Sequence, residues 1–530
     1  MDEFDYVVIG GGSSGCVVAS RLSENQGISV ALIEAGDSGD SWVVKTPIAG
    51  VLMVPTKLHN WAFETDPQPG LNGRRGYQPR GRTLGGSSAI NAMVYARGHR
   101  ADYDHWASLG NTGWAYDDVL PYFTKSECNE DFDGRWHGKE GPLNVARSRT
   151  DNPVHESFLQ AAHEAQLPLC EDFNIPEPEG LGIYQVTQKN GERCSVARAY
   201  IHPHIGKRPQ LSVKCGAHVR RILCEGRRAI GVEFIQGGAV HSVRARREII
   251  LSAGAIQSPQ ILMLSGIGDE EALRRMGIEV VAHLPGVGRN LQDHPDFVFN
   301  YTTKRLEFLG ISAAGLFHLA REFGRYRSKR RGMITTNFAE AGGFLKTRAD
   351  LLQPDIQLHF VVAMVEDHAR KLRLGHGYSC HFCLLRPRSR GAVTLRGPGP
   401  LEAPAIDPNF LGDPQDLEDM VAGFKLTRRL MDAPALASYC MRDLFAHARL
   451  DDEIRAILRE RVDTVYHPAG TCKMGTDEAA VVDPELRVRG LDRLRVVDVS
   501  IMPTLISGNT NAPAVMIGEK AAAMIGGPPR

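Results

Sequence analysis

The chain has 530 residues, more than the roughly 100 to 200 residues of a typical domain, so we expect at least two domains. Hydrophobic residues make up 42% and charged residues 23%, which is close to the globular norm and excludes a disordered tail or a fibre. The 62 basic and 62 acidic residues give a formal net charge of zero. Such a balance argues against nucleic-acid binding, because no overall positive charge is available to displace counterions.

The cysteines favour a reducing environment and no metal site. Ten cysteines are scattered along the chain and no secretory segment precedes the first apolar strand, so we expect a cytoplasmic protein. Cys380 and Cys383 have the spacing of a redox pair, but in a strand such positions point to opposite faces, which favours two separate buried thiols. No Cys/His cluster has zinc or iron–sulfur spacing, and no apolar run reaches the about 18 residues of a membrane span.

In chain order, the first predicted unit is a strand over 5–9, a helix over 15–23 and a strand over 29–33. The turn between the first two elements reads GGGSSG over 10–15 and satisfies G-x-G-x-x-G in the strand-to-helix context that this motif requires. Its glycines allow backbone N–H groups and a helix N-terminus to approach a pyrophosphate. Glu34 follows the second strand and can accept hydrogen bonds from a ribose. The sequence therefore predicts a dinucleotide site, with FAD and NAD both open.

The rest of the chain predicts two interleaved domains. A loop over 61–86 leads into a helix-like stretch over 89–95, and strands over 211–235, 248–252 and 494–499 return to the first sheet before a C-terminal helix over 514–525. The second unit has its own strands at 356–362, 378–385 and 392–395. We predict a first domain over 1–155, 210–300 and 455–530, and a second over 156–209 and 301–454.

Four further segments, in order along the whole chain, resemble the signatures of the glucose–methanol–choline (GMC) oxidoreductases. They are 81–91 (GRTLGGSSAIN), 254–268, 467–471 (HPAGT), and 498–503 running into 509–513 (NTNAP). Segments 58–63 and 91–99 resemble the choline-dehydrogenase-like branch, particularly its aliphatic alcohol dehydrogenases. The resemblance implies an α/β fold in which a Rossmann-like FAD-binding domain is interleaved with an α+β substrate-binding domain built on an antiparallel sheet.

The resemblance also implies FAD as the cofactor. Some relatives attach the flavin to a histidine at the position that is Ile90 here, so we expect non-covalent FAD. Carried over residue by residue, the FAD site comprises Gly10, Gly12, Ser13, Ser14, Gly15, Glu34, Ala35, Gly86, Asn91, Ala92, Met93, Val94, Val219, Ala253, Asp498 and Pro513.

His467 and Asn511 match the two catalytic positions of the family. His467 is predicted to act as the general base that takes the alcohol proton, a task suited to an imidazole that titrates near neutrality. Asn511 is predicted to donate to the same oxygen, although an Asn before Ala-Pro and an apolar helix is also a good N-cap, with Pro513 in the first turn. Tyr466 is expected to contact substrate, and His294 is assigned a structural role.

The predicted function is oxidation of an alcohol to an aldehyde or ketone, with a quinone or another non-oxygen electron acceptor. Two alternatives stay open: an oxidase that reduces oxygen to hydrogen peroxide, and a hydroxynitrile lyase in which FAD is structural. Trp61 and the apolar second domain favour an uncharged substrate over choline.

Residues 305–331 combine apolar positions with a basic end. Such a segment is either a solvated helix that caps the second domain or a surface that binds an anionic inner membrane peripherally. The apolar positions are Leu306, Phe308, Leu309, Ile311, Leu316, Phe317 and Leu319, and the basic ones are Arg321, Arg325, Arg327, Lys329, Arg330 and Arg331.

Overall fold

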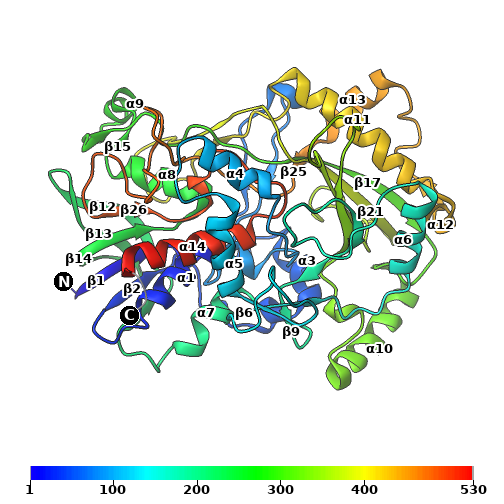
Figure 1. The fold of residues 1–530 in the computed structure, drawn as a ribbon, viewed down its shortest axis with the longest axis horizontal. Coiled ribbons are helices and arrows are strands. Elements are labelled where there is room, and N and C mark those ends of the chain that lie inside the picture. The colour runs from blue at the N-terminus through cyan, green and yellow to red at the C-terminus, as the bar shows by residue number, and fades with distance from the viewer. Residues whose placement is uncertain (1, 528–530) are drawn as a thin grey trace.

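The protein is built around two large β-sheets, one in each half of the molecule (Figure 1). The computed structural model describes residues 2–527. The first sheet has the order β11-β2-β1-β14-β13-β12, with β26 beside β14. Its strands are β1 (Asp2–Ile9), β2 (Val30–Ile33), β11 (Leu211–Lys214), β12 (His218–Glu225), β13 (Arg228–Gln236), β14 (Ala239–Leu251) and β26 (Leu494–Val496).

The centre of this sheet is parallel and buried on both faces. β1 pairs in parallel with β2 and β14, whereas β12, β13 and β14 form an antiparallel meander. β2 consists entirely of buried apolar residues, as expected for a parallel strand covered on both sides. Helix α1 (Ser13–Leu22) packs against the C-terminal helix α14 (Asn511–Gly526), and Figure 1 shows them along the sheet.

The second sheet is antiparallel, with the order β24-β17-β21-β20-β19-β7 and with β18 beside β21 and β25 beside β17. Its strands are β7 (Gly180–Ile183), β17 (Pro295–Thr303), β18 (Gly310–Ile311), β19 (Ala339–Leu345), β20 (Ile356–Val361), β21 (Gly375–Leu384), β24 (Arg442–Asp443) and β25 (Asp463–Thr464). The predicted fold class, an α/β dinucleotide-type domain interleaved with a domain on an antiparallel sheet, is confirmed.

One face of the second sheet packs on an aromatic core that includes Phe297, Phe299, Phe382 and Phe424. Helices cover that face, whereas the opposite face points toward the first domain and carries His359 and other cavity-lining residues. The remaining helices are α2 (Trp42–Lys45), α3 (Gly50–Met53), α4 (Arg100–Ser108), α5 (Tyr116–Ser126), α6 (Val154–Glu164), α7 (Val196–Tyr200), α8 (Gly254–Leu264), α9 (Glu270–Arg275), α10 (Ala313–Lys329), α11 (Pro414–Met431), α12 (Pro434–Ala437) and α13 (Asp451–Arg461).

Short strands complete the fold. They are β3 (Phe63–Glu64), β4 (Tyr77–Gln78), β5 (Glu127–Asn129), β6 (Leu143–Arg147), β8 (Gln185–Val186), β9 (Gln188–Lys189), β10 (Glu192–Arg193), β15 (Ile267–Gly268), β16 (Ala282–His283), β22 (Ala392–Thr394) and β23 (Ala405–Asp407). Within residues 2–527, no helix combines the length and apolarity needed to cross a bilayer. Cys380 and Cys383 are buried in different hydrophobic clusters on the two sides of β21, as the strand pattern predicted.

Three local predictions differ from the structure. The stretch 89–95 is not helical: a short 3₁₀ turn over Gly86–Ala89 is followed by irregular chain, because Met93 takes a left-handed conformation with a φ of 57°. The C-terminal helix begins at Asn511 rather than 514. The second sheet includes β17 from Pro295, before the boundary predicted at 301, and α7 packs on the core of the first domain.

Candidate active site

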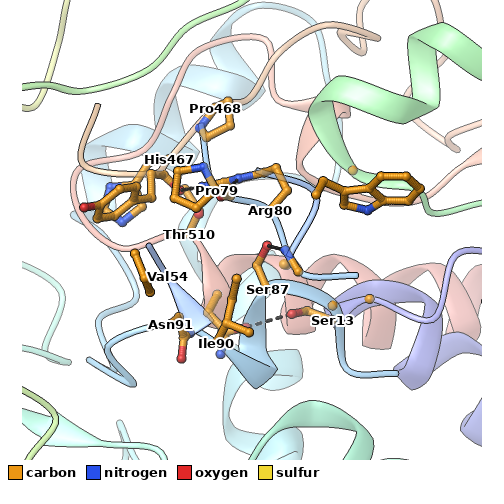
Figure 2. A pocket seen from close by; sticks show the side chains of 18 of the residues that line it. Ser13, Val54, Pro79, Arg80, Ser87, Ile90, Asn91, His467, Pro468 and Thr510 are labelled. Carbon is orange, nitrogen blue, oxygen red and sulfur yellow. Dashed lines mark hydrogen bonds between the residues drawn. The ribbon is translucent and has the colours of Figure 1, made fainter. Parts of the chain in front are cut away.

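A cavity of about 410 Å³ lies between the two sheets. It extends from the glycine turn after β1 to His467, which follows β25. Figure 2 shows His467 and Pro468 on one side of this cavity, with Ser13, Ile90 and Asn91 on the other. The cavity therefore brings together residues from both ends of the chain, as a site between interleaved domains requires.

The glycine turn forms one end of the cavity. The N-cap of α1 is Gly12, which has no side chain to occupy the first N–H groups of the helix. A Cβ on Gly86 would meet the Cα atom of Gly12 at 2.7 Å, so only glycines allow these two segments to lie this close. Gly15 does not line the cavity, but a Cβ there would meet the carbonyl oxygen of Gly10 at 1.9 Å. The turn thus leaves N–H donors and helix partial charge facing the cavity, which suits a pyrophosphate.

Glu34 lies at the same end. Its carboxylate accepts the N–H groups of Gly11 at 2.8 Å and Gly36 at 2.7 Å, and burial raises its pKa to about 7. Ala35, Val219 and Ala253, all predicted here, also line the cavity. This geometry suits an adenosine, with the carboxylate placed to accept ribose hydroxyls.

Asp498 lines the cavity, but its carboxylate is already engaged. One oxygen accepts the N–H of Gly254 at 2.9 Å and the hydroxyl of Ser258 at 2.5 Å, and the other accepts the N–H of Ser500 at 2.8 Å. In this structure Asp498 therefore holds the start of α8 in place. Pro513, predicted to contact the cofactor, does not line the cavity and is buried in α14 instead.

The middle of the cavity is lined by Gly86 and by residues 91–94, as predicted. The Asn91 side chain and carbonyl both accept from Arg193, at 2.9 and 2.6 Å, a buried arginine that the sequence analysis missed. Ile90 also lines the cavity and offers no nucleophilic atom.

His467 is held by three contacts. Its backbone N–H donates to Asp293 at 2.9 Å, its Nδ1 lies 3.0 Å from Nδ1 of His294, and its Nε2 lies 3.2 Å from the amide nitrogen of Asn509. The side-chain oxygen of Asn509 accepts from Gln357 at 3.0 Å, which fixes the amide so that its nitrogen donates to His467. Nε2 of His467 must then be the unprotonated nitrogen, and it is the one that faces Asn509 across the cavity.

Burial, reinforced by His294, His359 and Arg80, lowers the pKa of His467 well below its ordinary value. His467 is therefore neutral at physiological pH, the form that a general base needs. The expectation that this imidazole titrates near neutrality is wrong, because none of the groups that shift its pKa carries a negative charge. His294, assigned a structural role from the sequence, contacts His467 directly and so positions it.

Asn511 lines the cavity, but its side chain binds Ser13 and does not contact His467. Its side-chain oxygen accepts the hydroxyl of Ser13 at 2.8 Å, and its amide nitrogen has no hydrogen-bond partner among residues 2–527. The N-cap of α14 is Thr510, so the predicted N-cap role of Asn511 is wrong: Asn511 and Pro513 are the first and third helical residues. The amide that touches His467 belongs to Asn509, two residues earlier in the same motif.

Tyr466 lines the cavity, with a left-handed φ of 76°. Its hydroxyl lies 2.8 Å from Nδ1 of His368. Four polar residues that line the cavity were not predicted from the sequence: His359, His368, His381 and Asn509. Only Asn509 carried a signal, since it belongs to the NTNAP motif.

The residues present fit FAD. At Gly10 and Gly86 a Cβ would collide with neighbouring backbone, so these glycines let the backbone lie against a ligand. The buried Ser252 hydroxyl in the cavity wall has no partner among the described residues. A dinucleotide would be held by the turn over 10–15 and by Glu34, and its redox-active ring would lie toward residues 90–94.

Comparisons with known proteins agree with this site. The GMC oxidoreductase family matches residues 4–296 with its N-terminal part and 387–518 with its C-terminal part. The alcohol dehydrogenase [acceptor] of Pseudomonas putida is 44% identical over 527 residues, covering 98% of this chain and 95% of that protein. The mitochondrial choline dehydrogenase of Homo sapiens is 44% identical over 539 residues, covering 100% of this chain and 90% of that protein.

Among solved structures, pyridoxine 4-oxidase from Mesorbium loti superposes with a TM-score of 0.88 and 31% identity, covering 98% of each chain. GMC oxidoreductases use FAD, in agreement with the dinucleotide cradle described above. The family matches, the full-length relatives and the fold lead to one conclusion: this chain is an enzyme of the GMC oxidoreductase family.

Proposed function

We propose that the enzyme oxidises an uncharged alcohol to an aldehyde or ketone, with non-covalent FAD and an electron acceptor other than oxygen. The observation that carries the proposal is the neutral, buried His467, whose unprotonated Nε2 is oriented at the cavity by Asn509. FAD, when bound, supplies the hydride acceptor.

The chain's own residues account for the proton and for substrate orientation. When the alcohol hydroxyl replaces the Asn509 amide as the donor to Nε2, His467 takes the hydroxyl proton there, while the contact between its Nδ1 and His294 keeps the ring in place. The free amide nitrogen of Asn511 can donate to the alcohol oxygen as negative charge develops there. Asn509 fixes the ring orientation of His467.

The cavity favours an uncharged substrate. The part of its wall that the second sheet and its neighbouring loops contribute includes apolar side chains, among them Phe338, Val361, Met364, Val365 and Val465. Among the described lining residues, the carboxylates are Glu34 and Asp498, and both hold backbone N–H groups at the dinucleotide end. A quaternary ammonium such as choline would find no carboxylate in the cavity wall near His467, because Asp293, which binds the backbone N–H of His467, does not line the cavity. This distinguishes the proposal from the activity named for the human relative.

The decisive experiment is anaerobic addition of alcohols to the purified yellow enzyme. Primary alcohols of increasing chain length should bleach the flavin absorbance, and choline should do so much more slowly. Faster bleaching with choline would overturn the uncharged-substrate claim. No bleaching by any alcohol would favour a hydroxynitrile lyase with structural FAD.

Acid precipitation tests how FAD is held. Because position 90 is isoleucine, the flavin should be released into the supernatant. Yellow colour that stays in the pellet would contradict non-covalent binding.

The electron acceptor is tested separately. The alcohol dehydrogenase relative is named for an acceptor, whereas the solved relative is an oxidase, so both outcomes occur on this fold. We expect faster turnover with a quinone analogue than with oxygen. Stoichiometric hydrogen peroxide in air would assign the enzyme to the oxidases.

We further propose that the enzyme meets a membrane-dissolved quinone by binding peripherally to an anionic bilayer. Figure 1 shows α10 at the edge of the half that contains β17 and β21. Leu316 and Phe317 on α10 are 71% and 77% exposed, and Leu372 and Leu374 of a nearby loop are 77% and 85% exposed.

Basic side chains accompany these apolar residues, as binding to anionic lipid requires. Arg321, Arg327 and Lys329 are exposed and have no ion-pair partner among residues 2–527. Phe308, counted in the apolar set from the sequence, is fully buried against Tyr378 and cannot contribute.

Vesicles of phosphatidylglycerol and phosphatidylcholine should bind the enzyme at low salt and release it at high salt. The Phe317→Ser variant should bind more weakly. Equal sedimentation of the enzyme with and without these vesicles would remove the membrane proposal.

A further inference from the structure

The active-site cavity contains more histidines than the proposed oxidation uses. His359 lies on β20 and His381 on β21, and the two are directly opposite each other in the antiparallel register. Directly opposed residues have side chains on the same face, with Cβ atoms about 5 Å apart. The amide nitrogen of Asn509 lies 3.2 Å from Nε2 of His467 and 3.5 Å from Nε2 of His359. The residues His467, Asn509, His359 and His381 therefore form a row, in which hydrogen-bond distances link the first three and strand register places His381 beside His359.

His381 ends this row in a buried pair with a carboxylate. Its Nδ1 lies 2.7 Å from the carboxylate of Asp296 on β17, and both side chains are buried. Nε2 of His381 has no hydrogen-bond partner among residues 2–527, while the other oxygen of Asp296 is buried and unpaired. Within the described residues, the pair therefore has one unpaired atom at each end, Nε2 of His381 and one carboxylate oxygen of Asp296.

The pair also separates two cavities. A second cavity of about 430 Å³ lies behind the wall formed by Val365, His368, His381 and Tyr466, which line both spaces. Asp296 lines only the second cavity, and His359 lines only the first. The second cavity is rimmed by exposed charged residues: Arg370, Lys371, Arg373, Arg442, Glu460 and Arg461. It therefore opens to solvent, and His381 connects it with the active site.

His467 requires an outlet for the proton it receives. Its low pKa makes the protonated form unfavourable, so the proton must move on. The proton cannot leave through Nδ1 of His467. That nitrogen faces His294, and the other ring nitrogen of His294, Nε2, is buried and has no hydrogen-bond partner among the described residues to which a proton could pass. The row through His359 to His381 starts on the Nε2 side, where the proton arrives.

A second histidine in the wall is a weaker candidate. His368 is engaged at both ring nitrogens, by the hydroxyl of Tyr466 at 2.8 Å and by the carboxylate of Asp463 at 3.2 Å. Burial raises the pKa of Tyr466 far above its ordinary value, so this hydroxyl does not ionise. His368 thus has no free nitrogen toward the active site, whereas His381 does.

We propose that His381 and Asp296 carry the alcohol proton from the active-site cavity to the second cavity, a role that rests on the proposed alcohol oxidation. The O–H bond of the alcohol breaks and the proton binds Nε2 of His467. The amide nitrogen of Asn509 only donates and cannot take up a proton, so water in the active-site cavity carries the proton past Asn509 to Nε2 of His381. The Nδ1 proton of His381 then moves to Asp296, which releases it into the second cavity. One proton enters the row and one leaves it.

The test uses the FAD-loaded enzyme with His381→Gln, His381→Ala and Asp296→Asn. Each variant should lower steady-state turnover with a saturating alcohol by about 10- to 100-fold, less than the about 100- to 10,000-fold effect of the general base because these residues act only after the proton has left the alcohol. Each should also show a larger solvent deuterium isotope effect than the wild type, because proton transfer then limits the rate. Imidazole in the buffer should accelerate His381→Ala, since it can replace the missing ring.

His155→Gln is the matched control. His155 forms a histidine–carboxylate pair of the same 2.7 Å length with Glu340, and neither residue lines the two cavities. It should leave turnover, isotope effect and imidazole response unchanged.

The outcomes separate the two proposals. Wild-type turnover or isotope effect in His381→Gln would overturn the relay and leave the oxidation intact. Slower turnover without a larger isotope effect and without imidazole rescue would show a structural role only and would also overturn it. No flavin bleaching by any alcohol in the wild type would overturn the oxidation and the relay together. If a His381 variant does not fold, Asp296→Asn decides by its isotope effect.

Discussion

Replacement of His467 by alanine removes the group on which the proposed chemistry depends. A positioned general base contributes about 100- to 10,000-fold to rate, which corresponds to about 2.7 to 5.4 kcal/mol of transition-state stabilisation. FAD binding should persist, because the glycine turn and Glu34 lie at the other end of the cavity. The substitution also leaves Nδ1 of His294 without its partner, so we expect about 1 kcal/mol lower stability against unfolding.

The assay is anaerobic stopped-flow bleaching of flavin absorbance, with FAD occupancy measured from the visible spectrum before mixing. His467→Ala should keep its FAD and lose at least about 100-fold in the bleaching rate. His155→Gln, which lies outside both cavities, should bleach at the wild-type rate. Bleaching of His467→Ala at the wild-type rate would refute the assignment of the base.

The pH dependence gives a second check on the same residue. Burial and the neighbouring His294, His359 and Arg80 lower the pKa of His467, so its neutral form persists on acidification below its ordinary value of 6.5. The wild-type bleaching rate should therefore stay level between pH 8 and about 6.5. A loss of rate centred near pH 6.5 that disappears in His467→Ala would show that the base titrates normally and would contradict this environment.

Three further predictions concern the cofactor cradle and the fold. Gly86→Ala should lower FAD occupancy because its Cβ would meet Gly12, whereas Gly73→Ala, with a similar positive φ but open space, should not. FAD should bind the apoprotein more tightly as pH rises through about 7, where buried Glu34 ionises, and Glu34→Gln should bind with no such dependence. Burial lowers the pKa of His137, but its acidic partners Glu127 and Asp172 raise it to about 9. Protonated His137 therefore stabilises the fold fully below pH 6.5, and this stabilisation is lost as the pH rises through 9. His137→Gln should lower the melting temperature more at pH 6 than at pH 10.

The glycine turn and its surroundings were predictable because their geometry is local. A strand, three glycines and a helix within about 20 residues leave few alternatives for the chain. The stretch 89–95 was not, because its helical spacing is overridden by Met93, whose left-handed φ is fixed by a bond from its N–H to the side chain of Asn91. Propensity cannot reveal such a side-chain-to-backbone bond.

The histidine row shows a different limit. Strands over 356–362 and 378–385 were predicted, but not their register. A slip of one residue would turn His359 or His381 to the other face of the sheet, and only the observed pairing brings them together. The sequence likewise contains Asn509 and Asn511 in one motif. Which amide reaches His467 depends on where α14 begins, and a helix boundary cannot be assigned from sequence to within two residues.

The bond between Ser13 and Asn511 explains why the two ends of the chain share one site. It joins the first residue of α1 to the first residue of α14, which pack side by side (Figure 1). Neither helix has a side-chain hydrogen bond at its N-cap, Gly12 in one and Thr510 in the other. Both therefore direct unpaired N–H groups and partial positive charge at the same cavity, where an anionic cofactor would be stabilised. The C-terminal motif thus adds the partial positive charge of a second helix N-terminus to that of the N-terminal glycine turn, in addition to supplying Asn509 beside His467.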